Sequence, residues 1–152
     1  MKPRIYTDTS VLGGCEDKEF REPSRRLLEA FVRGDLILVL SELTVRELEN
    51  APYGVRALLG RIPADHIEGL AVSQESVELA TAYIDDGAID ARMRADALHI
   101  AAATVARVDV LVSWNFKHIV NLKRIHAYNA VNLKQGYPLL EIRTPREVSA
   151  DE

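Results

Sequence analysis

Three short apolar runs constrain the fold of this chain more than any other feature of its sequence. They are RIYTD (4–8), LILVL (36–40) and DVLVS (109–113). Each is rich in strand-forming residues and almost continuously apolar, a pattern typical of strands buried on both faces of a parallel sheet. Helical patterns separate the runs. The sequence therefore predicts an α/β fold, a three-layer α/β/α sandwich around a mainly parallel sheet.

Helix signals fill the segments between these runs. In EPSRRLLEAFVRGD, Pro23 suits a helix start and Gly34 a helix end, so the first two strands and this helix form a βαβ unit. Ser41 is the expected N-cap of ELTVRELEN, and Ser73 that of SQESVELATAYIDDG.

Three further elements are expected in the second half of the chain. They are helices at 94–107 and 122–134, and a candidate edge strand at 139–144. The order of the edge strands does not follow from these patterns.

Composition sets the class of protein. The chain has 152 residues, 47% hydrophobic and 28% charged, which predicts one soluble domain spanning 1–152. No apolar stretch approaches the roughly 20 residues of a membrane span, no secretory signal follows Met1, and Cys15 has no partner for an internal disulfide. We therefore expect a cytoplasmic protein with no membrane partner.

The charge is unevenly distributed. The net charge is −4, so composition alone does not indicate a polyanion-binding protein. Acids dominate residues 65–96, however, and bases dominate residues 113–146. This asymmetry suits a phosphate-bearing partner on the C-terminal part, although a solvated helix face explains it equally well.

Three carboxylates occupy positions that call for an explanation. Asp8 ends the first strand, and Glu47 lies on the inner stripe of its helix, whereas Glu42 faces outward. Asp96 lies in ADALHIAAA, where we expect burial, and an unpaired buried carboxylate costs several kcal/mol. Taken by itself, each acid is also explained by a structural role, as a helix cap or as a partner in a salt bridge.

Together, these carboxylates indicate a metal site. The polar break SWN after the third strand should open onto the same sheet edge. Carboxylates that converge on one spot are tolerated when a divalent cation binds between them. Oxygen ligands without a Cys/His set favour Mg²⁺ or Mn²⁺, ions that are often bound together with substrate phosphates.

These residues also carry a family resemblance. In order, YTDTSVL, LSELTVRELEN, ADALHIAAA and LVSWNFKHIVN resemble the PIN domain, the metal-dependent ribonuclease fold of VapC-type toxins in toxin-antitoxin pairs. The resemblance spans residues 4–142 and implies that Asp8, Glu47 and Asp96 are the first three acids of the site. Asn115 occupies the fourth place, where the family often has Asp.

The resemblance implies a Mg²⁺- or Mn²⁺-dependent endoribonuclease with an RNA substrate, a small antitoxin partner and a homodimeric state. Its catalytic and metal-binding residues would be Asp8, Glu47, Asp96 and Asn115, with Glu47 or Asp96 as the base. Ser10 and Thr9 would hold Asp8 or a metal-bound water by hydrogen bonds.

Several neighbouring side chains have two interpretations. Ser10, Lys117 and His118 are the candidates for substrate contact, and simple solvent exposure is the alternative for Lys117 and His118. His99 fits a packed core position better than a ligand position. Trp114 could stack a nucleobase, or it could be a packing residue.

Two other functions compete with the ribonuclease. A PIN-like domain that lost activity with its fourth acid would bind RNA or protein without cutting. A haloacid dehalogenase-like phosphatase also begins with Asp after its first strand, but it needs a second Asp where this chain has Ser10. The sequence does not identify which RNA would be cut.

Overall fold

The computed structural model describes residues 1–149, so the last three residues of the predicted domain lie outside the described part. Its sheet has five strands, all parallel, in the order β3-β2-β1-β4-β5. The strands are β1 (Arg4–Thr7), β2 (Ile37–Ser41), β3 (Ile67–Leu70), β4 (Val110–Val112) and β5 (Ile142–Arg143). The predicted α/β class and parallel sheet are confirmed.

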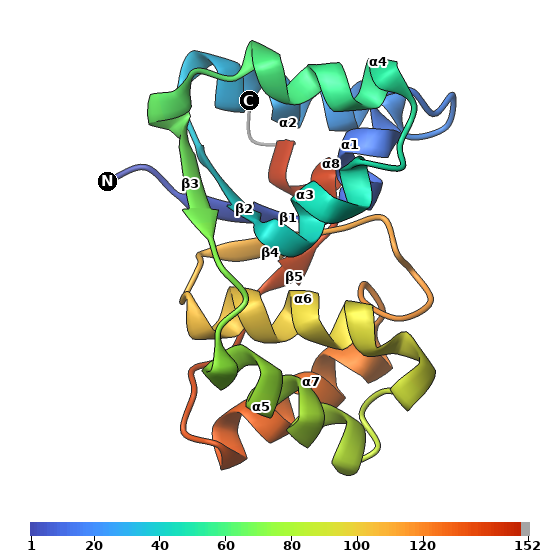
Figure 1. Ribbon diagram of the computed structural model, residues 1–152, viewed down its shortest axis with the longest axis vertical. Helices are drawn as coiled ribbons and strands as arrows, with labels where there is room; N and C mark the ends of the chain where they lie inside the picture. Colours follow the sequence, from blue (N-terminus) through green and yellow to red (C-terminus); the bar gives the residue numbers. More distant parts are fainter. Residues whose placement is uncertain (150–152) are drawn as a thin grey trace.

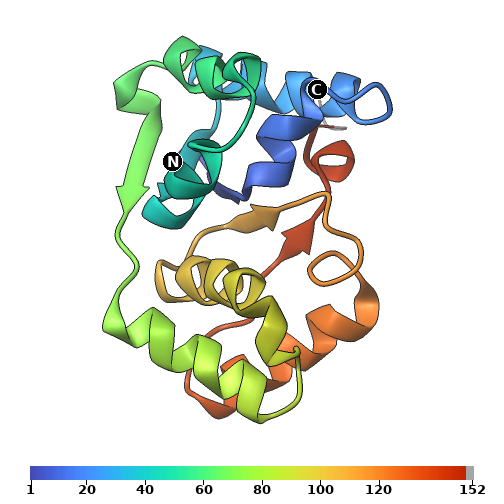
Figure 2. The ribbon, with the colours of Figure 1, turned by 45° about the vertical axis from the view of Figure 1, so that its right-hand side comes forward.

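Helices cover both faces of this sheet. The α-helices are α1 (Thr9–Gly14), α2 (Arg21–Arg33), α3 (Glu42–Leu48), α4 (Tyr53–Arg56), α5 (Gln74–Asp85), α6 (Arg94–Val105), α7 (Leu122–Lys134) and α8 (Pro145–Ser149). Short 3₁₀ turns are η1 (Ala57–Arg61), η2 (Ala64–His66) and η3 (Ala91–Met93). In Figures 1 and 2, α1 to α4 and α8 lie on one side of the sheet, and α5 to α7 lie on the other.

The strands alternate their side chains between two cores. Ile5 and Leu38 pack into the core under α2, whereas Tyr6 and Val39 pack into the core under α5 and α6. All four side chains are at most 1% exposed. Burial on both faces explains why these strands appear in the sequence as continuous apolar runs rather than as an alternating pattern.

The helix boundaries follow local signals. Ser41 and Ser73 accept hydrogen bonds from the backbone N–H groups of Thr44 and Ser76, so both predicted N-caps are confirmed. Gly34 ends α2 with φ of +82°, a conformation that L side chains rarely adopt. Within residues 1–149, none of the helices has the length and apolarity needed to cross a bilayer.

The strand order has its topological switch point beside β1. From β1 the chain moves outward to β2 and β3 through helices on one face, and it then returns to β4 and β5 through helices on the other face. Ligands of open parallel sheets bind beyond the carboxyl ends of the strands at such a switch point. The residues that follow β1 and β4 are therefore the first place to look for a site.

Candidate active site

Asp8 follows β1 and lies at the N-cap position of α1, yet its carboxylate does not cap the helix. Its two oxygens instead accept hydrogen bonds of 2.6 Å each, from the hydroxyls of Ser10 and Ser113. Ser113 follows β4, so the contact joins the two strands on either side of the topological switch point. The helix-cap explanation of Asp8 is therefore wrong, and the carboxylate is held in place at the sheet edge.

Asp8 is a poorly solvated acid with no cationic side chain to balance it. It is only 5% exposed, and no Lys or Arg within residues 1–149 forms an ion pair with it. Burial raises the pKa of Asp8, against the lowering effects of His99 and of the Ser10 and Ser113 hydrogen bonds, and the charge of Asp96 raises it further. The ionised form of Asp8 is thus disfavoured unless a positive charge arrives from outside the chain.

Glu47 lies in α3 on the inner side, as predicted, and it is held by two donors. Thr9 donates its hydroxyl proton to Oε1 at 2.7 Å, and Nε2 of His99 contacts the same oxygen at 2.8 Å. Thr9 therefore contacts Glu47, and the expectation that it holds Asp8 is not met. Oε2 of Glu47 has no hydrogen-bond partner within the described residues.

The environment of Glu47 favours its charged form. Burial alone would raise the pKa of Glu47, but the hydrogen bonds from His99 and Thr9 and the charge of His99 together lower it. Glu42, the rival for this place, accepts from the backbone N–H of Val72 and faces away from the site.

His99 belongs to the core, as predicted, but it also belongs to the site. Its ring is 2% exposed, and Nδ1 lies 2.7 Å from the hydroxyl of Tyr6, which in turn lies 2.9 Å from that of Ser41. Because these groups come from two strands and two helices, no local sequence pattern could reveal the chain of contacts from Ser41 to Glu47. A polar residue inside an otherwise apolar helix was the only signal.

Asp96 is less buried than the sequence suggested. Helix α6 begins at Arg94, so Asp96 lies in its first turn and its side chain is half-buried, not enclosed among the alanines. Burial still raises the pKa of Asp96, opposed by the charges of His99 and His118 and by a hydrogen bond from Asn115, and Glu47 raises it further. The charge of Glu47 thus raises the pKa of Asp96, and the charge of Asp96 raises that of Asp8, so these acids lie near enough to influence one another.

Asn115 lies near this group, because its side chain lowers the pKa of Asp96. Its Oδ1 accepts the backbone N–H of His118 at 2.9 Å, which leaves the amide N–H groups to donate to Asp96. Lys117 is exposed and has no ion-pair partner within the described residues. His118 is partly buried near Asp96, and its Nδ1 is a buried atom without a hydrogen-bond partner.

The donor set has the chemistry that magnesium prefers, but it does not form a complete protein cage. Within residues 1–149, no group of three or more His, Cys, Asp and Glu side chains is arranged to hold a metal ion. Mg²⁺ commonly takes one or two protein carboxylates and completes its shell with water and substrate phosphate oxygens. Asp8 and Asp96, two carboxylates without a Lys or Arg partner within the described residues, fit that mode of binding.

Comparison with solved structures identifies the fold. The chain is similar to VapBC2 from Rickettsia felis bound to a DNA fragment from their promoter, with 16% identity, a TM-score of 0.57, and coverage of 93% of this chain and 98% of that chain. It is also similar to VapC20 of Mycobacterium tuberculosis, a Sarcin-Ricin loop cleaving toxin, with 14% identity, a TM-score of 0.56, and coverage of 90% and 98%.

No family model matches the sequence, and the search of curated proteins found no matching relative. At these identities the likeness concerns the fold alone. The PIN-like fold of VapC toxins, which the sequence resemblance implied, is confirmed over nearly the whole chain.

Proposed function

We propose that the chain is a PIN-domain, VapC-type toxin, a Mg²⁺- or Mn²⁺-dependent endoribonuclease that hydrolyses RNA phosphodiester bonds in the cytoplasm. One observation carries the proposal. Asp8 and Asp96 lie at the carboxyl edge of a VapC-like sheet with raised pKa values and without cationic partners in the described chain. Such carboxylates are costly in a purely structural role and useful in a metal site.

Asp8 and Asp96 would hold the metal directly, and the free oxygen of Glu47 would contact a water bound to it. When bound, the ion would lower the pKa of a coordinated water and polarise the scissile phosphate. The hydroxyls of Ser10 and Ser113 fix both oxygens of Asp8, so the position of this ligand would not depend on the metal. Asn115 would orient Asp96 through its amide N–H groups.

Hydrolysis needs a group that accepts the proton of the attacking water. Glu47 suits this role because its lowered pKa keeps it ionised, His99 and Thr9 fix one of its oxygens, and the other is unoccupied. The water oxygen would bond to phosphorus as the bond from phosphorus to the leaving ribose oxygen breaks. The water proton would pass to Glu47, and the leaving oxygen would take a proton from solvent. Asp96 is the alternative acceptor.

The proposed partners follow from the same resemblance. One structural neighbour is VapBC2, and the other is a Sarcin-Ricin loop cleaving toxin. By analogy, we propose a small antitoxin protein as partner of this chain and a homodimer as its state.

Incubation of the purified protein with total RNA tests the proposal. We expect cleavage with Mg²⁺ or Mn²⁺ and none with EDTA, and sequencing of the new ends would identify the substrate. Glu68→Gln is a suitable control, because Glu68 lies away from the site and pairs with Arg4. Intact RNA at all divalent concentrations would favour the inactive RNA- or protein-binding module instead.

A further inference from the structure

Phe116 is an aromatic ring that lies in the open beside the candidate active site. It is 50% exposed, and it directly follows Asn115, the fourth residue of the proposed site, which comes just after β4. A half-exposed aromatic side chain usually gains a partner in a functional complex, and nucleobases are partners that any aromatic face can stack.

The backbone around Phe116 is held firmly. Its N–H donates to the carbonyl of Trp114 at 2.9 Å, and its own carbonyl accepts from Nδ2 of Asn121 at 2.9 Å. The carbonyl of Asn115 accepts the N–H groups of Ile119 and Val120, which closes the turn. A ring on such a turn would lose little conformational freedom when a ligand stacks on it.

Two further aromatic rings support Phe116 from below. The rings of Phe20 and Trp114 are stacked with centroids 4.2 Å apart, and both centroids lie about 6 Å from that of Phe116. Trp114 is only 7% exposed, and its Nε1 donates to Ser24. Trp114 is therefore a packing residue, and Phe116 is the ring that a base can reach.

Unpaired cations lie around these rings. Lys117 follows Phe116 in the turn, and the guanidinium of Arg146 lies 6.0 Å from the centroid of the Trp114 ring. Neither side chain has an ion-pair partner within residues 1–149. Cations without carboxylate partners are available to the phosphates that flank a stacked base.

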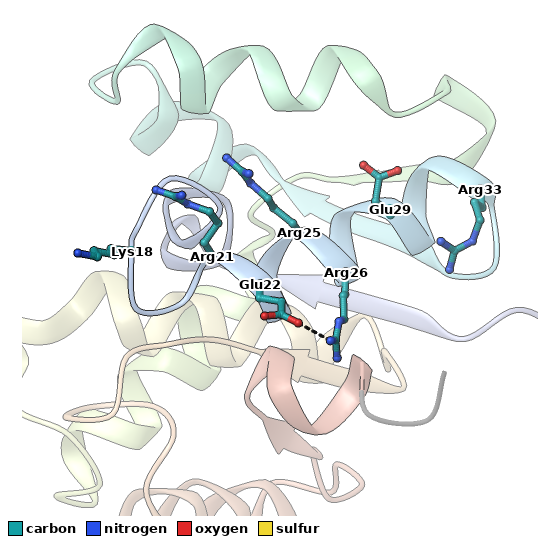
Figure 3. Close-up of a pocket in the computed structure, with 7 residues that line it drawn as sticks. All are labelled: Lys18, Arg21, Glu22, Arg25, Arg26, Glu29 and Arg33. Atoms are coloured by element: carbon teal, nitrogen blue, oxygen red, sulfur yellow. Dashed lines mark hydrogen bonds and ion pairs between the residues drawn. The ribbon is translucent and has the colours of Figure 1, made fainter.

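The groove along α2 is a contrasting charged surface, and it is a poorer candidate for RNA (Figure 3). Its volume is about 580 Å³, and it is lined by Lys18, Arg21, Glu22, Arg25, Arg26, Glu29 and Arg33. Three of its five cations already form ion pairs, Arg25 with Glu16, Arg26 with Glu22 and Arg33 with Asp35. This surface has no exposed aromatic ring among its lining residues, and most of its cations already have carboxylate partners.

We propose that Phe116, supported by Phe20 and Trp114, is a stacking platform for one unpaired nucleobase next to the scissile phosphate, with Lys117 contacting the adjacent backbone. The inference rests on the proposed function and adds to it a base-binding side chain, which needs at least one unstacked base at the cleavage position.

RNA binding by the full chain tests the platform. The probe is a short fluorescein-labelled single-stranded RNA of mixed sequence, measured by anisotropy with Asp96→Asn protein in EDTA so that cleavage does not interfere. Phe116→Ala should weaken binding by about fivefold to a hundredfold, whereas Phe116→Trp and Phe116→Tyr should retain it. Leu139→Ala is the matched control. Leu139 is 63% exposed and comes before β5, so it lies at the edge where the strands begin, whereas the candidate site lies where they end.

A series of the same RNA with one abasic nucleotide at each position locates the stacked base. An abasic nucleotide at one position of the RNA should weaken its binding to the Asp96→Asn protein. The same abasic nucleotide should not weaken binding further when the protein also carries Phe116→Ala, because the ring and the base then act as a coupled pair. Lys117→Ala should weaken binding and reduce the slope of affinity against salt by about one phosphate contact.

Three outcomes would overturn the inference. Unchanged RNA affinity in Phe116→Ala, alongside normal Mg²⁺-dependent cleavage by wild type, removes the platform and leaves the proposed function intact. An unchanged affinity combined with lost self-association in analytical ultracentrifugation identifies Phe116 as a protein interface. Neither binding nor cleavage of RNA by the wild-type protein rejects the platform and the proposed function together.

Discussion

The two edges of the parallel sheet treat their carboxylates in opposite ways. At the edge where the strands begin, the guanidinium of Arg4 binds Glu68 through two hydrogen bonds, of 2.6 and 2.8 Å, and its backbone N–H donates to Asp109. At the edge where the strands end, Asp8 and Asp96 are held by hydroxyl and amide donors, and no Lys or Arg in the described chain pairs with them.

The pKa values follow this difference. The hydrogen bond from Arg4 lowers the pKa of Glu68, whereas burial raises the pKa of Asp8 and of Asp96. Paired acids at the first edge stabilise the fold at neutral pH, and the unpaired acids at the second edge weaken it. Under the proposed function, a divalent cation bound at the second edge would offset this cost.

The largest expected effect is on catalysis. Asp8→Asn and Asp96→Asn should each lower Mg²⁺-dependent RNA cleavage by on the order of a thousandfold or more, because each removes several kcal/mol of metal-linked stabilisation. Single-turnover cleavage rates check this, with folding verified by circular dichroism. Glu68→Gln should leave the rate unchanged, and wild-type rates in either aspartate variant would break the contrast between the two edges.

Asn115 should have the next largest effect. Asn115→Ala should lower the cleavage rate roughly tenfold to a thousandfold with little change in metal affinity, since the amide orients Asp96 without contributing charge. Asn115→Asp should bind Mn²⁺ more tightly, because it adds a carboxylate beside Asp96. Mn²⁺ titration and single-turnover kinetics for both variants measure the two effects, and no change in either would reduce Asn115 to a turn residue.

The pH dependence of stability should have opposite signs at the two edges. The raised pKa of Asp8 means that the folded state binds its proton more tightly than the unfolded state, so this contribution to stability is present at low pH and is lost as pH rises through the folded pKa. The lowered pKa of Glu68 contributes stability above the unfolded pKa, near 4.3, that is lost as pH falls.

Denaturant unfolding in EDTA between acidic and neutral pH tests these signs. Asp8→Asn should gain stability relative to wild type as pH rises toward neutral. Glu68→Gln should lose no more than about 1 kcal/mol at neutral pH, because the pair is partly exposed, and should approach wild type in acid. If the stability of the two variants relative to wild type changed with pH in the same direction, the assignment of paired acids to one edge and unpaired acids to the other would be contradicted.

Much of this fold was predictable because the buried strands leave a strong signal. The predicted runs at 4–8, 36–40 and 109–113 each lie within a residue or two of β1, β2 and β4. Strand β3 escaped because its four residues, IEGL, include a charge and a glycine and none of them is fully buried. Helix α1 escaped because its six residues end in two glycines.

The site was predictable where chain position determines geometry. Asp8 had to lie at the carboxyl edge because it ends a parallel strand, and Glu47 had to face inward because of its place on the helix stripe. The partners were not predictable, since Ser113 meets Asp8 across two strands and His99 meets Glu47 from another layer. The exposure of Phe116 likewise depends on how Phe20 and Trp114 pack beneath it.

Thermal unfolding during a Mn²⁺ titration tests the central claim most directly, that the unpaired acids at the carboxyl edge form a divalent metal site. The wild-type melting temperature should rise with Mn²⁺, with about 2.7 kcal/mol of added stability at a hundred times the Kd, because the ion binds only the folded state. Glu68→Gln should show the same rise, and Asp8→Asn and Asp96→Asn should show little or none. A wild-type melting temperature that does not respond to Mn²⁺, or an equal rise in all four proteins, would contradict the account.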